Sequence, residues 1–393
     1  MTPVIILKRN KEKPIRQRHP WIFSGAIARV QGSPSAGDVV DVRAQNGEWL
    51  ARAEFNSRSQ IRARAFCWDE NTAVDEDFWR ERLARAISRR DAMLPAAQAR
   101  RLVFAESDGL PGLIVDAYNN HLVTQFLTAG AEARKSMTVR HLITLLTPTS
   151  IIERDDPMRR KEGLSPADGA LHGRPPTEPL VISENEHRFL VDLRSGQKTG
   201  FYLDQAANRA ALAPYSAGKV VLNAFSYTGA FAVYALAAGA KHVINLDSSS
   251  DALALADANL RLNGFAGDRW QNITADVFKQ LRHWRDEGQQ FDLIILDPPK
   301  FATTRANLQR ATRGYKDINW LAMRLLRSGG LLATFSCSGL VSIDLFQKIL
   351  FGAALDAGRN VRIVKYFHQN ADHPVLLSFP EAGYLKGFLL HVQ

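Results

Sequence analysis

The sequence predicts an α/β protein whose C-terminal half is a doubly wound parallel sheet, preceded by a small β-barrel and a central α+β module. From about residue 196 onward, apolar runs of strand length alternate regularly with helical segments, and this alternation is typical of a doubly wound sheet. Residues 1–72 instead hold short apolar runs broken by turn signals. Residues 73–195 mix an amphipathic helix with paired strands. The expected domains are therefore 1–72, 73–195 and 196–393.

Composition narrows the class of protein. A chain of 393 residues has room for two or three domains, and 46% hydrophobic with 23% charged residues is typical of a soluble globular protein. The formal net charge of +10 favours a polyanionic partner. Cys67 and Cys337 are too few for a disulfide framework or a cysteine-based metal site, so no metal is expected.

The N-terminus has a short apolar run followed by charges, which is too short for a signal peptide. No apolar run reaches the roughly 18 residues of a membrane span. We therefore expect a cytoplasmic protein with no membrane partner. The oligomeric state stays open, with a homodimer among the options.

The N-terminal segment shows three candidate strands, Val4–Leu7, Val39–Val42 and Trp49–Phe55. Turn signals such as Gly32-Ser33-Pro34 and Gln45-Asn46-Gly47 separate them. Short strands at this spacing predict a small β-barrel.

A basic segment interrupts these strands between residues 8 and 21. Cations of this density can neutralise phosphates, and a tryptophan beside them can stack on a base or a ribose. The alternative is a solvated loop whose tryptophan packs in the core. The candidate RNA-binding residues here are Lys8, Arg9, Lys11, Lys13, Arg16, Arg18 and Trp21.

The middle module begins with a predicted helix over Asp77–Met93, because apolar residues recur on one face. Two strands, Leu113–Tyr118 and His121–Phe126, are joined by Asn119-Asn120, which suits a hairpin turn. Residues 157–179 are polar and rich in proline and glycine, which predicts a long surface loop. The remaining expected elements are strands over Arg101–Glu106 and Ser150–Arg154 and a helix over Ala131–Leu146.

The C-terminal half supplies the alternating pattern. The expected strands are Val220–Ala224, Val243–Leu246, Ile273–Ala275, Leu293–Leu296, Leu331–Phe335, Val361–Phe367 and Leu385–Val392. The expected helices include Ala230–Ala238, Asn307–Leu326 (ended by Gly329-Gly330) and Asp344–Ala357, with two more that end near Asn263 and Trp284.

Polar residues at the ends of the first strands of this half predict a nucleoside site. Gly229 at the end of the first strand's turn lets the backbone of the protein approach a ligand closely. The turn lacks the GxGxxG motif, which argues against binding of a dinucleotide pyrophosphate. Carboxylates ending successive strands line the crevice where such sheets bind ligands, Asp247 for ribose hydroxyls and Asp276 for an adenine amino group. A nucleoside without phosphate indicates S-adenosylmethionine. The candidate cofactor-binding residues are Asn223, Phe225, Tyr227, Thr228, Gly229, Asp247, Ser248, Asp276 and Asp297.

Two further strand ends carry groups suited to catalysis. The buried run Leu293–Leu296 stops at Asp297, and the two prolines that follow cannot continue a sheet ladder. The run Leu331–Phe335 leads to Cys337. If the two strands are neighbours, the carboxylate and the thiol line one pocket.

These motifs resemble the bacterial large-subunit ribosomal RNA methyltransferase I family, which makes 5-methylcytosine in 23S rRNA. The resemblance implies an S-adenosylmethionine-dependent methyltransferase domain, an N-terminal PUA domain, an RNA-facing middle module and a 23S rRNA or large-subunit precursor as partner. It also implies cofactor contacts by Phe201 and Asp204. The matching segments are residues 198–205, 223–231, 297–301, 335–339 and 371–374.

Methylation of cytosine at carbon 5 needs a nucleophilic group of the enzyme, because carbon 5 is itself a poor nucleophile. A thiolate that adds to carbon 6 makes carbon 5 enamine-like, and Cys337 is the candidate, with an inert buried cysteine as the alternative. Asp297 is expected to hydrogen-bond the ring. Related enzymes carry a second cysteine after the Asp-Pro pair, where this chain has Lys300, so the base that removes the carbon-5 proton is unassigned. Lys300 either lowers the thiol pKa or contacts phosphate.

Two other functions stay open at this point. One is an RNA methyltransferase that acts on an exocyclic amine or a purine ring nitrogen, which needs no cysteine. Asp-Pro-Pro followed by an aromatic residue serves amine methylation, but here Lys300 separates Phe301 from that pattern. The other alternative is a non-catalytic RNA-binding protein on a methyltransferase fold. The sequence names neither the target cytosine nor the form of the substrate, free rRNA or assembled subunit.

Overall fold

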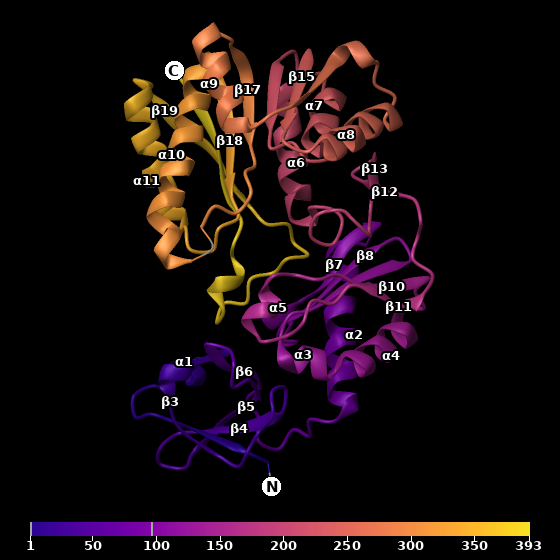
Figure 1. Cartoon of the computed structure of the whole chain (residues 1–393), viewed down its shortest axis with the longest axis vertical. Coiled ribbons are helices and arrows are strands. Elements are labelled where there is room, and N and C mark those ends of the chain that lie inside the picture. The colour runs from indigo at the N-terminus through magenta and orange to yellow at the C-terminus, as the bar shows by residue number, and fades with distance from the viewer. Residues whose placement is uncertain (1, 96, 303) are drawn as a thin grey trace. The chain divides into compact units, whose positions relative to one another are not determined.

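The computed structural model describes residues 2–95, 97–302 and 304–393. The chain forms two compact units, each described here by itself (Figure 1). The first unit comprises residues 1–182, 191–203 and 371–382, and the second comprises residues 183–190, 204–370 and 383–393. The three domain boundaries expected from the sequence stay a prediction.

The first unit begins with a six-stranded sheet in the order β2-β6-β5-β4-β1-β3. The three strands predicted here are present, and β2, β3, β6 and a short helix α1 (Lys13–Arg16) are additional. Alternate residues such as Val40 and Val42 are fully buried, which explains the strand pattern. The strands are β1 Val4–Leu7, β2 Trp21–Phe23, β3 Ile27–Gln31, β4 Val39–Arg43, β5 Trp49–Phe55 and β6 Ile61–Cys67.

The same unit continues with a five-stranded sheet in the order β11-β10-β9-β8-β7. The predicted hairpin is confirmed, because β8 and β9 pair antiparallel with Tyr118 opposite His121. The predicted helix is confirmed as α2, which buries Leu83 completely. The elements are α2 Glu76–Met93, β7 Ala99–Phe104, β8 Leu113–Tyr118, β9 His121–Phe126, α3 Ala129–Ala133, α4 Lys135–Leu146, β10 Ser150–Glu153, α5 Met158–Lys161 and β11 Gly169–Gly173.

One prediction for this module was wrong, and another missed a break in a helix. The loop expected over residues 157–179 contains α5 and β11, and β11 pairs with the open edge of β10. Arg159 of α5 is buried and forms ion pairs with Glu153, six residues earlier, and with the more distant Glu132. Local composition does not reveal these contacts. The helix expected over Ala131–Leu146 is present as two helices, α3 and α4, which meet at Arg134. The Arg134 guanidinium packs on the Trp79 ring at 4.1 Å.

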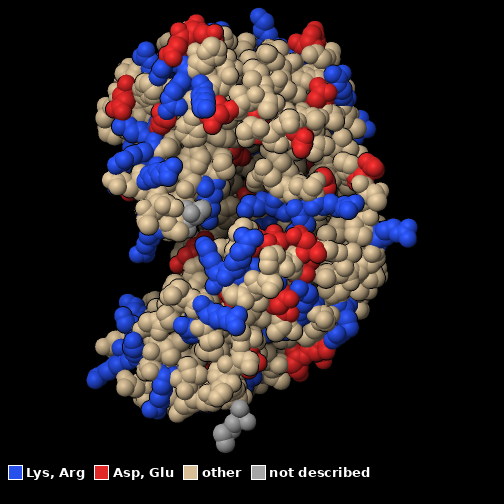
Figure 2. All heavy atoms as spheres, in the orientation of Figure 1, with Lys and Arg blue, Asp and Glu red and all other residues tan. Residues whose placement is uncertain are grey.

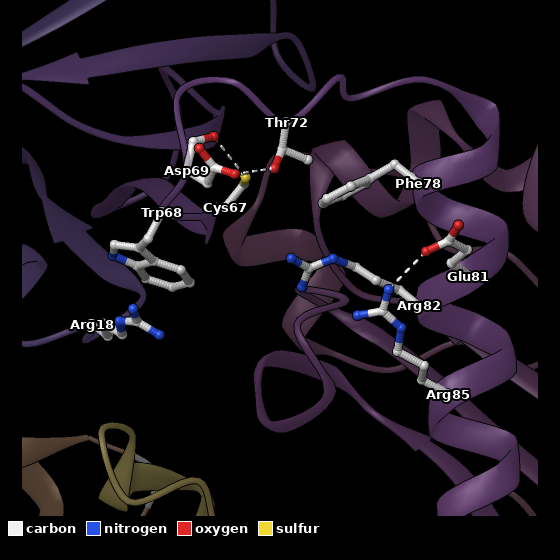
Figure 3. A pocket seen from close by; sticks show the side chains of 9 residues that line it. All are labelled: Arg18, Cys67, Trp68, Asp69, Thr72, Phe78, Glu81, Arg82 and Arg85. Atoms are coloured by element: carbon white, nitrogen blue, oxygen red, sulfur yellow. Dashed lines mark hydrogen bonds and ion pairs between the residues drawn. The ribbon is translucent and has the colours of Figure 1, made fainter.

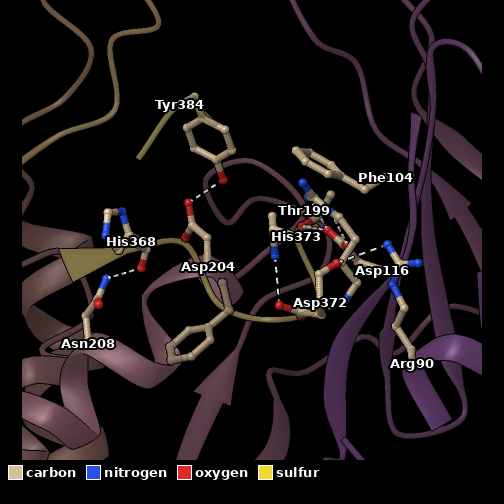
Figure 4. A network of polar contacts seen from close by, with 12 residues as sticks. Arg90, Phe104, Asp116, Thr199, Asp204, Asn208, His368, Asp372, His373 and Tyr384 are labelled. Carbon is tan, nitrogen blue, oxygen red and sulfur yellow. Dashed lines mark hydrogen bonds and ion pairs between the residues drawn. The ribbon is translucent and has the colours of Figure 1, made fainter. Parts of the chain in front are cut away.

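The segment 371–382 is anchored in the first unit by a buried network (Figure 4). The Asp372 carboxylate accepts from the Arg101 backbone N–H at 2.8 Å and contacts His373 Nδ1 at 2.8 Å. Arg90 donates to the Asp372 carbonyl and forms a two-pronged ion pair with Asp108, both bonds 2.7 Å long. The Ala371–Pro374 motif therefore holds a C-terminal segment against β7.

The second unit is built on a seven-stranded sheet in the order β16-β15-β14-β17-β18-β20-β19. The first five strands are parallel, whereas β20 runs antiparallel to both β18 and β19. The strands are β14 Val220–Ala224, β15 His242–Asp247, β16 Trp270–Thr274, β17 Phe291–Leu296, β18 Leu326–Ser336, β19 Val361–His368 and β20 Lys386–Val392.

Helices cover this sheet in two groups: α9 and α11 pack against α10, and α6 and α8 pack against α7 (Figure 1). Gly329-Gly330 does not end α10 as predicted, because the helix stops at Leu325 and both glycines lie within β18. The helix α6 and a two-stranded β12–β13 sheet were not predicted. The bounds are α6 Ala206–Leu212, α7 Ala230–Ala237, α8 Ser250–Leu262, α9 Val277–Glu287, α10 Leu308–Leu325, α11 Ile343–Ala357, β12 Leu180–Glu184 and β13 His187–Val191.

In the part of the chain that the structure describes, every helix is too short or too polar to cross a membrane. The same residues contain no group of three or more His, Cys, Asp or Glu side chains placed to hold a metal ion.

Candidate active site

The strands that carry Asp297 and Cys337 are neighbours. In the second unit β17 and β18 pair in parallel, with Leu296 opposite Thr334. Asp297 directly follows β17 and Cys337 directly follows β18. Because the carboxyl ends of parallel strands meet at one edge of a sheet, the carboxyl and the thiol belong to the same edge, as the sequence argument required.

One oxygen of the Asp297 carboxyl is hydrogen-bonded within the protein, and the other can bind a ligand. Its Oδ2 accepts from Gln205 Nε2 at 3.0 Å, and Gln205 Oε1 in turn accepts from Asn208 Nδ2 at 2.7 Å. Its Oδ1 has no hydrogen-bond partner among the described residues. Burial, reinforced by the negative charge of Asp204, raises the pKa of Asp297 to about 7. This carboxyl therefore binds a proton over part of the neutral range.

The residues that support Asp297 come from α6 and the turn before it. Asp204 is buried and accepts from the Tyr384 hydroxyl at 2.5 Å, while Asn208 donates to the His368 carbonyl at 2.9 Å (Figure 4). Sequence reasoning missed Gln205 and Asn208 as site residues. Gln205 did stand at the end of a matched segment, but α6 itself was not foreseen.

Cys337 is partly exposed and lies between two buried serines. Ser336 donates to the Tyr315 hydroxyl at 3.0 Å, and the Ser338 hydroxyl lies 3.1 Å from the same oxygen. Ser338 Oγ also accepts from the Ala302 backbone N–H at 3.2 Å. The serines thus fasten the backbone on both sides of Cys337 to α10 and to the loop after β17.

Lys386 lies beside this thiol and was missed by the sequence analysis. It pairs with Ser336 across β20 and β18, and its Nζ donates to the carbonyls of Ser338 at 2.7 Å and Val341 at 2.6 Å. The side chain is only 5% exposed and has no carboxylate ion pair among the described residues. Burial lowers the pKa of Lys386 to about 8, the charge on Cys337 raises it, and the exposed Lys300 lowers it.

The turn between β14 and α7 has the features of a ligand cradle. Phe225 (φ 60°) and Tyr227 (φ 47°) adopt left-handed backbone conformations, which cost about 1–3 kcal/mol each in residues other than glycine. Asp247, at the end of β15, holds this turn by accepting from the Tyr227 backbone N–H at 2.8 Å. The hydroxyls of Ser226 and Thr228 are buried without a hydrogen-bond partner among the described residues.

This turn suits S-adenosylmethionine chemically. Unpaired buried hydroxyls are uncommon in native proteins, so those of Ser226 and Thr228 favour a polar ligand at the turn. The Asp247 carboxylate offers acceptors for ribose hydroxyls, and no cluster of phosphate-binding glycines is present. A nucleoside without phosphate groups fits this set of donors and acceptors.

Other predicted cofactor residues make contacts within the protein. Asn223 is buried and donates to Asn245 at 2.9 Å across β14 and β15. Asp276 caps α9 by accepting from the Lys279 backbone N–H at 2.9 Å, and Ser248 is exposed. Gly229 has φ 72°, and a Cβ there would lie 2.8 Å from the Ala256 Cβ, so close packing against α8 requires glycine.

The aromatic candidates are also engaged. The Phe301 ring lies 4.7 Å from the Tyr315 ring, and Phe225 lies 6.4 Å from Phe278. Phe201 belongs to the first unit, where it is buried and its backbone N–H donates to the Tyr118 hydroxyl at 3.2 Å.

Most of the predicted RNA-binding residues of the first unit are exposed, and many lysine and arginine side chains are visible on the face shown in Figure 2. Lys8 donates to the Gly25 carbonyl at 3.0 Å, and Arg16 pairs with Glu48. Trp21 is partly buried: its Nε1 donates to Glu106 at 2.8 Å and its ring meets Phe379 edge-on at 4.8 Å. Arg9, Lys11, Lys13 and Arg18 are solvent-exposed.

Comparison with known proteins agrees with this arrangement. Residues 158–361 match the model of a family of S-adenosylmethionine-dependent methyltransferases, and residues 5–68 match that of a PUA-like domain. The fold resembles that of a candidate methyltransferase from Streptococcus mutans, with a TM-score of 0.87, 20% identity and full coverage of both chains. A second solved structure with the same values contains a methyltransferase complexed with SAH.

Curated relatives match over their whole length. "Ribosomal RNA large subunit methyltransferase I" of Aeromonas salmonicida (strain A449) is 50% identical over 396 residues, covering 100% of each chain. The protein of the same name from Aliivibrio fischeri (strain MJ11) is 49% identical over 395 residues, again covering 100% of each chain. The chain therefore belongs to the ribosomal RNA large subunit methyltransferase I family and is an S-adenosylmethionine-dependent methyltransferase with an N-terminal PUA-like domain.

Proposed function

We propose that this enzyme methylates carbon 5 of a cytosine in 23S rRNA through a covalent bond between Cys337 and carbon 6. The observation that carries the proposal is the parallel pairing of β17 and β18, which assigns a thiol and a carboxyl of raised pKa to one sheet edge. Relatives named for large-subunit ribosomal RNA support rRNA as the substrate class.

Each catalytic residue has a separate task in this mechanism. The Cys337 thiolate adds to carbon 6, and protonated Asp297 donates a hydrogen bond to ring nitrogen 3, which receives the displaced electron density. Bound S-adenosylmethionine supplies an electrophilic methyl group. Loss of the carbon-5 proton then restores the ring double bond and expels the thiolate. The base that takes this proton is unassigned.

Lys386 is proposed as a positioning residue for the nucleophile. Its two bonds to the carbonyls of Ser338 and Val341 fix the backbone that follows Cys337. An ammonium buried without a carboxylate is unfavourable, and a thiolate at Cys337 supplies the missing negative charge. The two groups therefore stabilise each other when both are charged.

Replacing Lys386 by methionine is expected to move the pH midpoint of Cys337 alkylation upward by about one unit, because the thiolate loses its cation. Iodoacetamide labelling at graded pH, read by peptide mass spectrometry, measures this midpoint. Lys386→Arg should restore most of the shift. A midpoint unchanged in folded Lys386→Met would reduce Lys386 to a structural role.

The predicted cofactor set stays as proposed, with Asp247 at its centre. Asp247→Asn is expected to weaken S-adenosylmethionine binding about 10-fold to 100-fold, the loss typical of a hydrogen bond to a charged group. Titration calorimetry measures it. Asp251→Asn, at the exposed start of α8, is the matched control and should bind normally. Equal affinity of the two variants for S-adenosylmethionine would show that Asp247 does not bind the cofactor.

The nature of the methylated base decides between this function and its rival. Purified enzyme, S-adenosylmethionine and 23S rRNA should yield 5-methylcytosine when the RNA is digested and analysed by mass spectrometry. A methylated exocyclic amine or purine ring nitrogen would replace the proposed chemistry by the alternative. The RNA contacts proposed for residues 8–21 and Lys300, a cytoplasmic location and a homodimer stay predictions.

A further inference from the structure

A cavity of about 340 Å³ lies in the first unit. Of the residues that line it, Arg18 also belongs to the candidate RNA-binding residues, and none belongs to the proposed active site or cofactor site. Its volume is within the range of small-ligand sites. Figure 3 shows Trp68 and Arg18 on one side and the side chains of α2 on the other. The lining residues are Arg18, Cys67, Trp68, Asp69, Thr72, Phe78, Glu81, Arg82 and Arg85.

Arg82 is the unusual residue of this cavity. Its guanidinium is partly buried, donates to the Gly109 carbonyl at 3.1 Å and lies 4.4 Å from the centre of the Phe78 ring. None of the described carboxylates forms an ion pair with it. Burial lowers the pKa of Arg82 most, Cys67 raises it, and Arg85 and Arg89 lower it further. A desolvated cation among other cations is unfavourable without an anion, so this site favours an anionic ligand.

The acidic residues of the cavity are already engaged. Glu81 pairs with Arg85 at 2.7 Å. Asp69 accepts from the Asn71 backbone N–H at 3.0 Å and from the Thr72 hydroxyl at 2.9 Å. Neither carboxylate neutralises Arg82, and the exposed Arg18 adds a further cation without an ion pair among the described residues.

Trp68 gives the cavity an aromatic surface. The residue is only partly buried, and its Nε1 is anchored to the Ile15 carbonyl at 3.1 Å. An indole fixed at its edge lines the same cavity as the Arg18 and Arg82 guanidinium groups. Cations that hold the backbone and a ring that stacks on a base are the combination that binds single-stranded nucleic acid.

We propose that this cavity binds one unpaired nucleotide of the rRNA substrate, with its phosphate between Arg82 and Arg18 and its base against Trp68. The proposal rests on rRNA as the substrate but not on the choice of cytosine carbon 5. It assigns Arg82 and Trp68 to substrate binding together with Arg18, which the sequence had already indicated.

The test measures the affinity of the full-length protein for an rRNA fragment at several salt concentrations. Arg82→Gln is expected to weaken binding about 10-fold and to reduce the slope of log K against log salt by about 0.7–0.9, the loss of one phosphate contact. Arg80→Gln is the matched control, because Arg80 is on the same helix but pairs with Asp77 at the solvent face. Its affinity and slope should stay within twofold of wild type.

A second measurement keeps the proposal testable if Arg82→Gln unfolds. RNA that carries 5-bromouridine, irradiated in the complex, should cross-link to the peptide that contains Trp68. Trp68→Phe should retain affinity, whereas Trp68→Leu should lose about 5-fold or more. An unchanged affinity and salt slope in folded Arg82→Gln, or cross-links only elsewhere, would overturn the proposal.

The outcome is independent of the proposed chemistry. Cys337→Ser should bind the fragment with wild-type affinity and slope, and Arg82→Gln should raise KM for RNA while leaving kcat at saturating RNA unchanged. If the enzyme modifies a base other than cytosine, the binding result still decides whether the cavity contacts RNA.

Discussion

Cys337→Ser is expected to abolish methyl transfer, with a loss on the order of 10⁴-fold or more, while S-adenosylmethionine binding persists. Serine keeps the size and hydrogen-bonding capacity of the side chain. Its hydroxyl is a far weaker nucleophile than a thiolate and cannot form the adduct at carbon 6. Single-turnover methylation of rRNA measures the rate, and calorimetry measures cofactor binding.

The matched control is Cys67→Ser, because Cys67 is the other cysteine of the chain and lies outside the proposed active site. Cys67 does line the cavity proposed to bind RNA, so the two variants are compared at saturating RNA. Cys67→Ser should methylate at close to the wild-type rate. An rRNA substrate with 5-fluorocytidine at the target adds a direct readout, since fluorine cannot leave as a proton and the protein–RNA adduct accumulates. Full activity of Cys337→Ser would contradict the cytosine-5 mechanism. Absence of S-adenosylmethionine binding by the wild-type protein would favour a non-catalytic RNA-binding role.

Asp297→Asn is expected to slow methylation about 10²-fold to 10⁴-fold and to change its pH dependence. In the proposed mechanism protonated Asp297 assists catalysis, and burial places the pKa of Asp297 at about 7. The wild-type rate should therefore fall as pH rises through about 7, opposing the gain from thiolate formation. Asparagine stays a neutral donor at every pH, so the variant should lose this fall and follow thiolate formation alone. Single-turnover rates between pH 6 and 9 measure both profiles.

The sign of the pH effect separates the two methylation chemistries. Methylation of an exocyclic amine needs an ionised Asp297 to accept from the amino group, so the rate would rise as pH increases through about 7. Gln205→Leu offers a second readout: the hydrogen bond from Gln205 lowers the pKa of Asp297, and its loss should move the alkaline fall to higher pH. A wild-type pH profile with the same shape as that of Asp297→Asn would contradict the role given to Asp297.

Local sequence was sufficient for the two strands whose ends carry the proposed catalytic groups. The buried run before Asp297 and the one before Cys337 needed only apolar periodicity and two prolines to be recognised. Asp297 and Cys337 follow the carboxyl ends of parallel strands, and ligands of open α/β sheets bind at that edge. The turn ending at Gly229 was visible for the same reason.

Elements held by long-range contacts were not visible locally. The strand β11 forms because the edge of β10 is open, and α5 is held by the buried ion pairs of Arg159. Gly329-Gly330 looked like a helix stop, but the helix ends at Leu325 and both glycines lie within β18. Gly330 pairs with Val392 of β20, and Gly329 (φ 81°) lies where the register between β17 and β18 shifts. Propensity is weak in comparison with such pairing.

The sequence by itself determined the alternating α/β architecture, the three carboxylates at successive strand ends and Cys337 as the candidate nucleophile. Only the tertiary structure brought Lys386 beside Cys337 and Gln205 onto Asp297. Only it left Arg82 partly buried with no counter-ion among the residues that the structure describes. The physical reason is that burial and pairing between distant residues set the charge state of a group. A Lys in an apolar strand or an Arg on an amphipathic helix shows nothing of its partners until the chain has folded.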